Sequence, residues 1–246
     1  MTILVGLLCK DGIVIGSDSS ATFGTMQNHT IEQPTDKIEI IDGKVIIAGT
    51  GQVGLGQRFV HEVAKHWRAN SIKGSPTEVA SHMCRIGIEN FASTQARQQQ
   101  YGALVAFPNS VKNTLCEFAC EDFQPELKTD KLWYCSMGSG QSIVDPFLGL
   151  MRQTFWTDGP PTLEDGVFTV AWALTHAINV NPGGVGPPIK IATLKDGKAK
   201  FLTSEEIQNH QTNVEGVLDH LREYPKIING KGQGKDAPLN IPVVKQ

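Results

Sequence analysis

Residues 2–18 of this chain, TILVGLLCKDGIVIGSD, decide how its first elements fold. Apolar runs stand on either side of the pair Asp11-Gly12, and an Asp-Gly pair in that setting is the strongest local signal for a β-hairpin with a type I′ turn. Such a hairpin folds the second strand back along the first. It therefore places Asp18, at the end of the second strand, beside Thr2, at the start of the first.

The same signal recurs at Asp42-Gly43 and at Asp196-Gly197. Both central residues of a type I′ turn need positive φ, which Asp and Gly tolerate, so each pair predicts a tight hairpin. The three predicted hairpins join residues 3–9 with 13–18, 37–41 with 44–48, and 189–194 with 198–202. Further strands are expected at residues 101–107, 114–118 and 132–136.

Helix signals lie between these strands. Residues 75–78 and 203–206 are capping boxes, residues 161–165 start a third helix, and residues 53–67 carry apolar side chains at helical spacing. Helices thus occur in pairs between groups of strands, which disagrees with a parallel βαβ sheet. We expect an α+β fold, a four-layer αββα sandwich in which two antiparallel sheets pack together and helices flank them.

Length and composition indicate one globular domain. The chain has 246 residues, of which 40% are hydrophobic and 19% charged, enough for one substantial core. Beyond residue 222 the sequence turns to Gly, Lys, Pro and Asn with little periodicity. We therefore expect a domain over residues 1–222 and a C-terminal tail over residues 223–246, which either extends freely or docks on a neighbouring subunit.

Charge and hydropathy disfavour several functional classes. A formal net charge of −3, with scattered Lys and Arg, argues against nucleic-acid binding. No apolar run approaches the roughly 18 residues of a membrane span, and the N-terminus lacks the pattern of a signal peptide. The five cysteines are odd in number and form no CxxC pair, which fits reduced thiols in a cytoplasmic protein.

Thr2 is the first candidate for chemistry. Processing enzymes usually remove an initiator Met that precedes a small residue, so the mature chain is expected to begin at Thr2. A threonine hydroxyl is a weak nucleophile without a base, and an N-terminal threonine carries that base in its own α-amine, with a pKa of about 8. Many chains begin Met-Thr for no chemical reason, so this hypothesis depends on the residues around Thr2.

A nucleophile of this kind needs a cation, a carboxylate that orients the cation, and an oxyanion donor. Asp18 is the carboxylate that the first hairpin brings back, and Lys37 begins the next strand. Gly49 ends the strand after that, just before a helix, where backbone N–H groups favour negative charge. Taken singly, the three residues are ordinary: a strand-end cap, a solvated charge on an edge strand, and a turn glycine. Their order and spacing together favour the catalytic interpretation.

The sequence closely resembles the proteasome β-subunit family of N-terminal nucleophile hydrolases. The likeness covers about residues 2–210, through Gly183-Gly184 and the closing hairpin, and within the family it is greatest to bacterial proteasome homologues such as the betaproteobacterial group. It implies the N-terminal nucleophile hydrolase fold and threonine peptidase activity. The motifs that carry it lie at residues 2–6, 11–22, 36–38, 47–49 and 137–140.

The resemblance also implies roles for matching positions. Thr2 would be the nucleophile and, through its amine, the general base. Lys37 would lower the pKa of that system, with Asp18 holding the lysine, and the Gly49 N–H would stabilise the oxyanion. Ser139 would hydrogen-bond near the threonine amine, although a serine before a helical stretch is also an ordinary cap.

Further matching positions are implied to bind substrate. Thr22 matches the threonine whose backbone pairs with the bound peptide as an added strand. A pocket beside Gly49 would accept neutral or apolar side chains and would be lined by Thr35, Ile47 and Gly51.

Two positions depart from the family pattern. The family commonly places an acid and a serine just before Gly183-Gly184, near the threonine amine, and this chain has Asn179 and Pro182 there. Asn keeps hydrogen-bonding capacity without the charge, whereas Pro offers neither a hydroxyl nor a backbone N–H. We include Asn179 among the candidate catalytic residues. The alternative is a catalytically weak or inactive ring or scaffold protein with the same fold.

Other motifs are weaker. Gly49–Gly54 satisfies GxGxxG, but Asn70 stands where a dinucleotide site needs an acid, and a second helix follows. His61 and His66 are five apart, whereas zinc-binding histidines on a helix are four apart. We therefore expect no cofactor and no metal.

The resemblance implies a homo-oligomer, expected as two stacked rings of seven subunits with six-fold rings as the alternative. Peptides or unfolded proteins would be the substrate, in the cytoplasm, with no nucleic-acid or membrane partner; whether an ATPase unfoldase serves it is left open. Apolar residues at 103–107 and 147–155 exceed what one core obviously needs and are candidates for subunit contacts.

Overall fold

In a computed structural model, the described residues are 2–25, 28–94, 101–109, 112–181 and 183–228, and they form two five-stranded antiparallel sheets. We call them the β1 sheet and the β6 sheet. In spatial order the β1 sheet contains β10 (Tyr134–Met137), β1 (Leu4–Leu8), β2 (Ile13–Ser17), β11 (Lys190–Lys195) and β12 (Lys198–Phe201). The β6 sheet contains β5 (Ile38–Ile41), β6 (Val45–Gly51), β7 (Tyr101–Phe107), β8 (Thr114–Phe118) and β9 (Pro125–Leu127).

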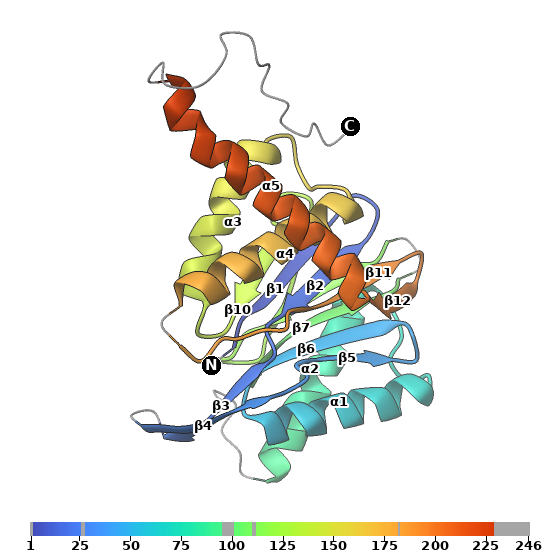
Figure 1. Cartoon of the computed structure of the whole chain (residues 1–246). Helices are drawn as coiled ribbons and strands as arrows, with labels where there is room; N and C mark the ends of the chain where they lie inside the picture. The colour runs from blue at the N-terminus through green and yellow to red at the C-terminus, as the bar shows by residue number, and fades with distance from the viewer. Residues whose placement is uncertain (1, 26–27, 95–100, 110–111, 182, 229–246) are drawn as a thin grey trace.

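Helices cover the outer face of each sheet (Figure 1). Two helices, α1 (Val53–Arg68) and α2 (Pro76–Ser93), pack on the β6 sheet. On the β1 sheet lie α3 (Gln141–Phe155) and α4 (Leu163–Val180), and α5 (Ser204–Ile228) packs on α4. The expected four-layer αββα sandwich is therefore confirmed.

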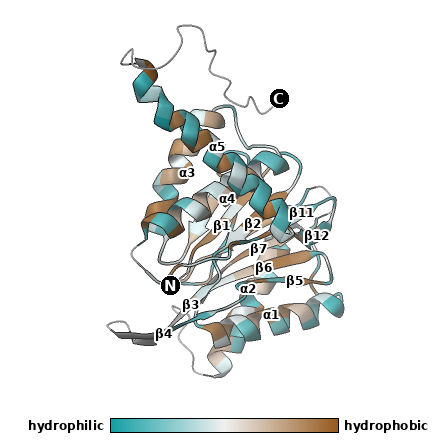
Figure 2. Cartoon of the chain, viewed as in Figure 1, coloured by the Kyte–Doolittle hydropathy of each residue, from teal (hydrophilic) through white to brown (hydrophobic). Residues whose placement is uncertain are grey.

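Alternation along β6 shows how the sequence fills both interiors. Ile46 and Ala48 face the β1 sheet, whereas Val45 and Ile47 face α1 and α2. A strand buried on both faces is expected to be largely apolar, and the sequences of β6 and β7 have this character. In Figure 2, brown marks hydrophobic residues on central strands such as β6, and teal marks much of the helical ribbons. Residues 103–107, expected at a subunit contact, instead lie wholly in this core.

Two of the three predicted type I′ turns are confirmed. Asp42-Gly43 and Asp196-Gly197 take positive φ at both residues, 50° and 64° in the first pair and 50° and 71° in the second. The charge-rich, exposed turns leave their backbone free to follow the local preference.

At Asp11-Gly12 the predicted hairpin is confirmed, because β1 pairs with β2, but the predicted turn type is wrong, because neither residue takes a positive φ. Cys9 N–H donates to the Gly12 carbonyl at 2.8 Å, directly before β2 begins at Ile13. A Cβ on Gly12 would lie 2.9 Å from both the Leu163 side chain and the Leu194 carbonyl. Close packing against α4 and β11 thus explains this glycine, and turn geometry does not.

A third, two-stranded sheet follows β2 directly and was not anticipated. It is the hairpin of β3 (Ser20–Thr25) and β4 (Asn28–Pro34), which extends from the sandwich in Figure 1. At the other end of the chain, α5 continues to Ile228 with Pro225 inside it, so it includes the first residues assigned to the tail. Residues 229–246 lie outside the described part. Among the described residues no helix is both long and apolar enough to cross a lipid bilayer.

Candidate active site

Asp18 is the residue around which the site is built. It follows β2 and its side chain is fully buried. Its Oδ1 accepts hydrogen bonds from the Ile3 backbone N–H at 2.9 Å and from Lys37 Nζ at 2.5 Å. The Asp18 N–H in turn donates to the Ile3 carbonyl at 3.3 Å. The first hairpin therefore joins Asp18 to the N-terminal strand, as the sequence predicts.

Lys37 is buried with Asp18, its side chain being only 6% exposed. Burial lowers the pKa of Lys37 below its usual value, while the charge and hydrogen bond of Asp18, followed by the charge of Glu32, act to raise that pKa. A buried charge is tolerated only when it is paired in this way. The predicted lysine–carboxylate pair is thus present, and the expectation of a solvated surface lysine is excluded.

Thr2 lies against the turn between β10 and α3. Its nitrogen, joined in this chain to Met1, donates to Ser139 Oγ at 3.1 Å, and its carbonyl accepts from the Gly140 N–H at 3.3 Å. Gly138 has a φ of +95°, and a Cβ there would lie 2.3 Å from the Thr2 carbonyl oxygen. The turn must therefore carry glycine to approach the N-terminal strand so closely.

Hydrogen bonds bring four of the predicted residues together: Thr2 with Ser139, and Asp18 with Lys37, while Ile3 joins the two pairs along β1. The backbone of Thr2 and Ile3 thus connects the Ser139 hydroxyl with the Asp18–Lys37 pair.

Gly49 lies close to these residues, but its N–H already donates a hydrogen bond within the fold. It donates to the Lys37 carbonyl at 3.0 Å, as part of the pairing between β6 and the entry to β5. The absence of a side chain has a packing reason, because a Cβ at Gly49 would lie 2.7 Å from the hydroxyl of the fully buried Tyr101. An oxyanion role for Gly49 therefore requires its N–H to be shared with, or released from, Lys37.

The positions expected to bind substrate are dispersed. Thr22 lies in β3 opposite Glu32, and Thr35 is half-buried, with its N–H donating to the Ser19 carbonyl at 3.0 Å. Gly51 is exposed at the end of β6. Ile47 is 1% exposed and packs in the core beneath α1 and α2, so it does not line an open pocket here.

Asn179 lies exposed in the last turn of α4. Within the described residues, no hydrogen bond joins its side chain to Thr2 or Ser139. Asn181 caps the helix, and its Oδ1 accepts from the Gly183 N–H at 3.0 Å. Pro182, the second departure from the family pattern, falls outside the described residues.

Three residues that sequence reasoning missed also contact Asp18 or its partners. Ser20 and Gly186 donate backbone N–H bonds to Asp18 Oδ2, at 3.1 and 3.4 Å. The Ser20 hydroxyl donates to the carboxylate of Glu32. The position of Ser20 two residues after Asp18 was a usable signal, because Asp commonly accepts a bond from the N–H two residues on. Nothing local pointed to Gly186 or Glu32.

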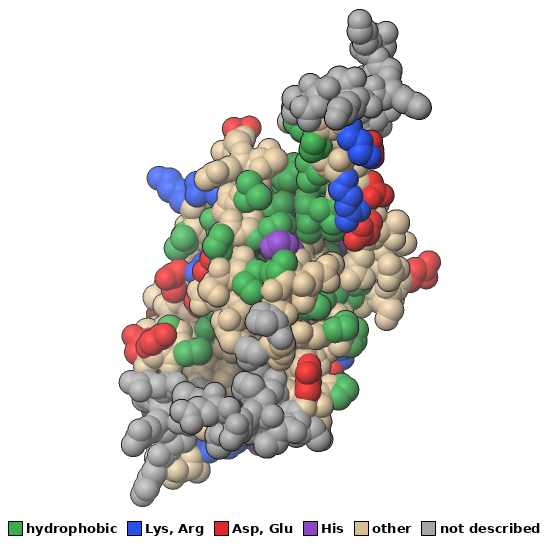
Figure 3. Space-filling view, turned by 60° about the vertical axis from the view of Figure 1, so that its left-hand side comes forward, with side chains coloured by type: hydrophobic (Ala, Val, Ile, Leu, Met, Phe, Trp, Pro, Cys, Tyr) green, Lys and Arg blue, Asp and Glu red, His purple; other side chains and the backbone are tan. Residues whose placement is uncertain are grey.

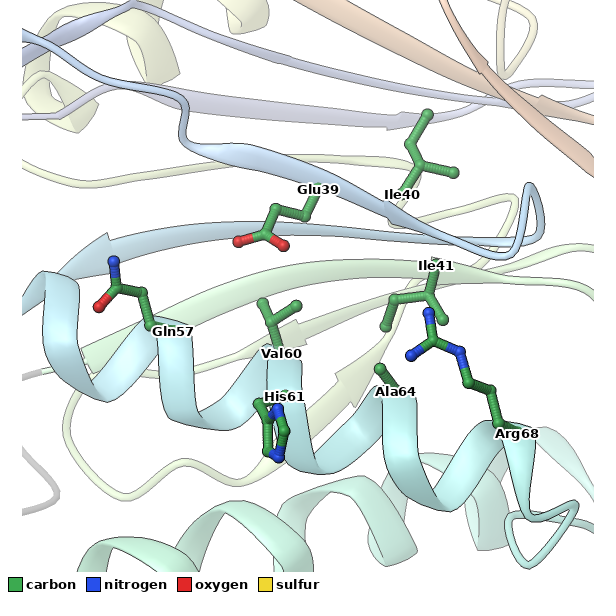
Figure 4. A pocket seen from close by; sticks show the side chains of 8 residues that line it. All are labelled: Glu39, Ile40, Ile41, Gln57, Val60, His61, Ala64 and Arg68. Atoms are coloured by element: carbon green, nitrogen blue, oxygen red, sulfur yellow. The ribbon is translucent and has the colours of Figure 1, made fainter.

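A groove of about 370 Å³ lies between β5 and α1 (Figure 4). Glu39 and Gln57 face each other at one end, and Arg68 lies at the other. It contains none of the residues proposed for catalysis, although Glu39 follows Lys37 closely along the chain. His61 also lines the groove, and across the described residues no three potential metal ligands gather in one place.

Comparisons with known proteins identify the family and the fold. The family model described as proteasome subunit matches residues 2–181. A search of curated proteins gives no match. Among solved structures, a Gly-1 mutant of Anbu from Hyphomicrobium sp. strain MC1 superposes with a TM-score of 0.70, covering 96% of this chain and 100% of that chain at 14% identity. At that identity the structural likeness shows the fold, while the matched residues 2–181 contain all the candidate catalytic positions.

Proposed function

Because this chain belongs to the proteasome subunit family, we propose that it is a threonine peptidase whose nucleophile is Thr2 after removal of Met1. The observation that carries the proposal is the buried pair of Asp18 and Lys37, hydrogen-bonded through Ile3 to the strand that begins with Thr2. A buried ion pair is costly to maintain for stability alone, so its place beside a potential nucleophile favours a chemical role.

The reaction would proceed through an ester. The Thr2 hydroxyl oxygen attacks the carbonyl carbon of a peptide bond, and the hydroxyl proton passes to the Thr2 α-amine. The carbon–nitrogen bond breaks as the leaving amine takes that proton, which leaves the acyl group on Thr2. Water then attacks the ester, again with the α-amine as base, and releases the acid and the free threonine.

The neighbouring residues have defined tasks in this scheme. A positive charge on Lys37 disfavours a second one on the α-amine, so the amine stays available as a base. Asp18 fixes Lys37, and Ser139 holds the Thr2 nitrogen at 3.1 Å. The oxyanion would take the Gly49 N–H in competition with the Lys37 carbonyl, which makes a small shift of the β5 entry part of the catalytic cycle.

Intact mass after treatment with a β-lactone tests the proposal. We expect a mass that lacks Met1 and gains one inhibitor, together with hydrolysis of fluorogenic peptides. Thr2→Ala should abolish both the inhibitor labelling and the peptide hydrolysis. Thr2→Ser should keep labelling, because an N-terminal serine offers the same hydroxyl and amine. Full retention of Met1 in protein from its native host, or labelling that survives in Thr2→Ala, would contradict the assignment.

A second candidate is a ring or scaffold protein without turnover. Asn179 in place of the usual acid, its exposed position, and the occupied N–H of Gly49 favour it. The two candidates differ in one measurement, because only a peptidase gives covalent labelling at Thr2.

We propose further that the protein acts as a ring-shaped homo-oligomer in the cytoplasm, on peptides or unfolded chains. Family membership supports oligomeric rings in general, and confinement inside a chamber would keep the nucleophile away from folded proteins. We retain two stacked rings of seven, with six-fold rings as the alternative.

A further inference from the structure

Ser20 connects two carboxylates. Its backbone N–H donates to Asp18 Oδ2 at 3.1 Å, and its hydroxyl donates to the carboxylate of Glu32. Ser20 is itself buried, 4% exposed, so its bond to Asp18 is shielded from water, whereas Glu32 is exposed and the bond to its carboxylate is partly buried. Hydrogen bonds to charged acceptors in such surroundings are among the stronger ones in proteins. A change at Glu32 is therefore transmitted directly to the residue that orients Asp18.

Gly186 donates to Asp18 and also lies close to Glu32. Its N–H donates to Asp18 Oδ2 at 3.4 Å, and its carbonyl accepts from the Ser19 N–H at 3.0 Å. A Cβ on Gly186 would lie 3.3 Å from a Glu32 carboxylate oxygen. Glu32 thus lies against both residues whose N–H groups hold Asp18 Oδ2, which leaves Asp18 Oδ1 directed toward Lys37 and Ile3.

We propose that Glu32 is a positioning residue of this site, a second carboxylate that fixes Ser20 and Gly186 around Asp18 and supplies negative charge near Lys37. The role is independent of the position where the family places its acid, because Glu32 belongs to β4 and Asn179 to α4. The consequence for turnover rests on the proposed peptidase function, whereas the effect on the Asp18–Lys37 pair does not.

The other charged groups near Lys37 define what the charge of Glu32 adds to the surroundings of this lysine. Asp18 pairs with Lys37 directly, and the charge of Glu32 also acts to raise the Lys37 pKa. Asp36, the preceding residue, is instead paired with Lys190 of β11, and Glu39 faces the groove beneath α1. After removal of Met1, the α-amine of Thr2 would be the further titrating group on this side.

Titration of the lysines by NMR, with ¹³Cε-labelled lysine in the full chain, tests the charge. Lys37 is assigned from Lys37→Arg. Glu32→Gln keeps an oxygen that accepts the Ser20 hydroxyl but removes the charge, so we expect the Lys37 pKa to fall. Glu89→Gln, at an exposed position on α2 on the outer face of the β6 sheet, is the matched control and should leave the Lys37 pKa unchanged.

Rates of β-lactone labelling test the positioning. Ser20→Ala and Glu32→Ala should each slow labelling by about tenfold, as expected when a supporting shell is loosened. The double variant should be no slower than the worse single variant, because both changes break one chain of contacts. In Glu32→Gln the limb of the pH profile that follows Lys37 should move to lower pH, which a purely structural change would not produce.

The two measurements separate failure of this inference from failure of the proposed function. Circular dichroism verifies that each variant is folded. If the wild-type chain proves inactive, the Lys37 titration still reports on Glu32. An unchanged Lys37 pKa in folded Glu32→Gln would overturn the charge role. Equal labelling rates in wild type, Ser20→Ala and Glu32→Ala would overturn the positioning role.

Discussion

Glycines set the distances in the candidate site. Gly138 has a positive φ and also lies against the Thr2 carbonyl, so a side chain at this position is unfavourable for two separate reasons. We expect Gly138→Ala to lower stability by about 1–3 kcal/mol, as found for strained positions, and to abolish labelling of Thr2. Gly149→Ala, within α3 and with open space where its Cβ would lie, should instead leave labelling intact. Denaturation measures the stability of the two variants, and intact mass measures their labelling. A stable, labelled Gly138→Ala variant would refute this role for the glycine.

Asn179 can be replaced by the acid that the family commonly has near this position. If the missing acid limits turnover, Asn179→Asp should raise peptide hydrolysis by about tenfold, a modest share of what general acid–base groups contribute. The exposed side chain makes the substitution easy to accommodate. Steady-state rates on a fluorogenic peptide measure the effect, and Asn181→Asp, at the end of the same helix, is the control. No gain in Asn179→Asp would mean that proton transfer here does not depend on that position.

Much of the residue-scale site could be predicted because its members are tied to motifs along the chain. Asp18 and Lys37 sit at strand ends that the hairpin pattern locates, and the structure pairs them. Glu32 and Gly186 could not be found in this way, because Glu32 contacts Ser20 from a separate hairpin and Gly186 contacts Asp18 from the loop before β11. The bond between Gly49 and Lys37 depends on strand register, which local sequence does not fix.

At the scale of elements, local rules succeeded where the chain is exposed and failed where packing intervened. The turns at Asp42 and Asp196 follow the Asp-Gly preference, whereas Gly12 is governed by its contacts with Leu163 and Leu194. The hairpin of β3 and β4 escaped notice because its strands lack a clear alternation of apolar and polar residues. The tail was expected from residue 223, yet α5 continues to Ile228 with Pro225 inside it.

The capping box of α2 gives a test at this scale. Ser75 accepts the Glu78 N–H, and the Glu78 carboxylate accepts the Ser75 N–H at 2.7 Å. Ser75→Ala removes one cap, and we expect a loss of about 1 kcal/mol. Ser81→Ala, at an exposed position within the same helix, should have a smaller effect of either sign. Urea denaturation compares the two, and equal losses would show that the cap contributes nothing specific.

At the scale of the whole molecule, the helical layer of α3, α4 and α5 carries the exposed apolar surface. Figure 3 shows apolar side chains gathered on this face. Leu150 and Phe155 of α3 are 58% and 39% exposed, and Leu221, Tyr224 and Ile227 of α5 are about half exposed. Contiguous apolar side chains of this size commonly mark contacts between proteins. The subunit contact expected at residues 147–155 stays a prediction, and the exposure of Leu150 and Phe155 supports it, whereas residues 103–107 are buried.

Native mass spectrometry tests the proposed assembly. We expect fourteen subunits, and Leu150→Glu should shift the population to smaller species, because a buried charge at a contact is unfavourable. Gln153→Glu adds the same charge at another exposed position of α3 and is the control. A wild-type monomer or dimer at micromolar concentration would contradict the ring. A twelve-subunit species would contradict only its seven-fold order. An intact ring in Leu150→Glu would contradict the assignment of this surface to a subunit contact.

The way the first strand is anchored bears on when the proposed enzyme becomes active. The Thr2 carbonyl, the Ile3 N–H and the Ile3 carbonyl are all held by bonds from the rest of the fold, and each lies downstream of the Met1–Thr2 bond. Cutting that bond removes none of them. Exposing the Thr2 α-amine would therefore need no refolding of this strand, because the bonds that position Thr2 and Ile3 exist before the amine is free.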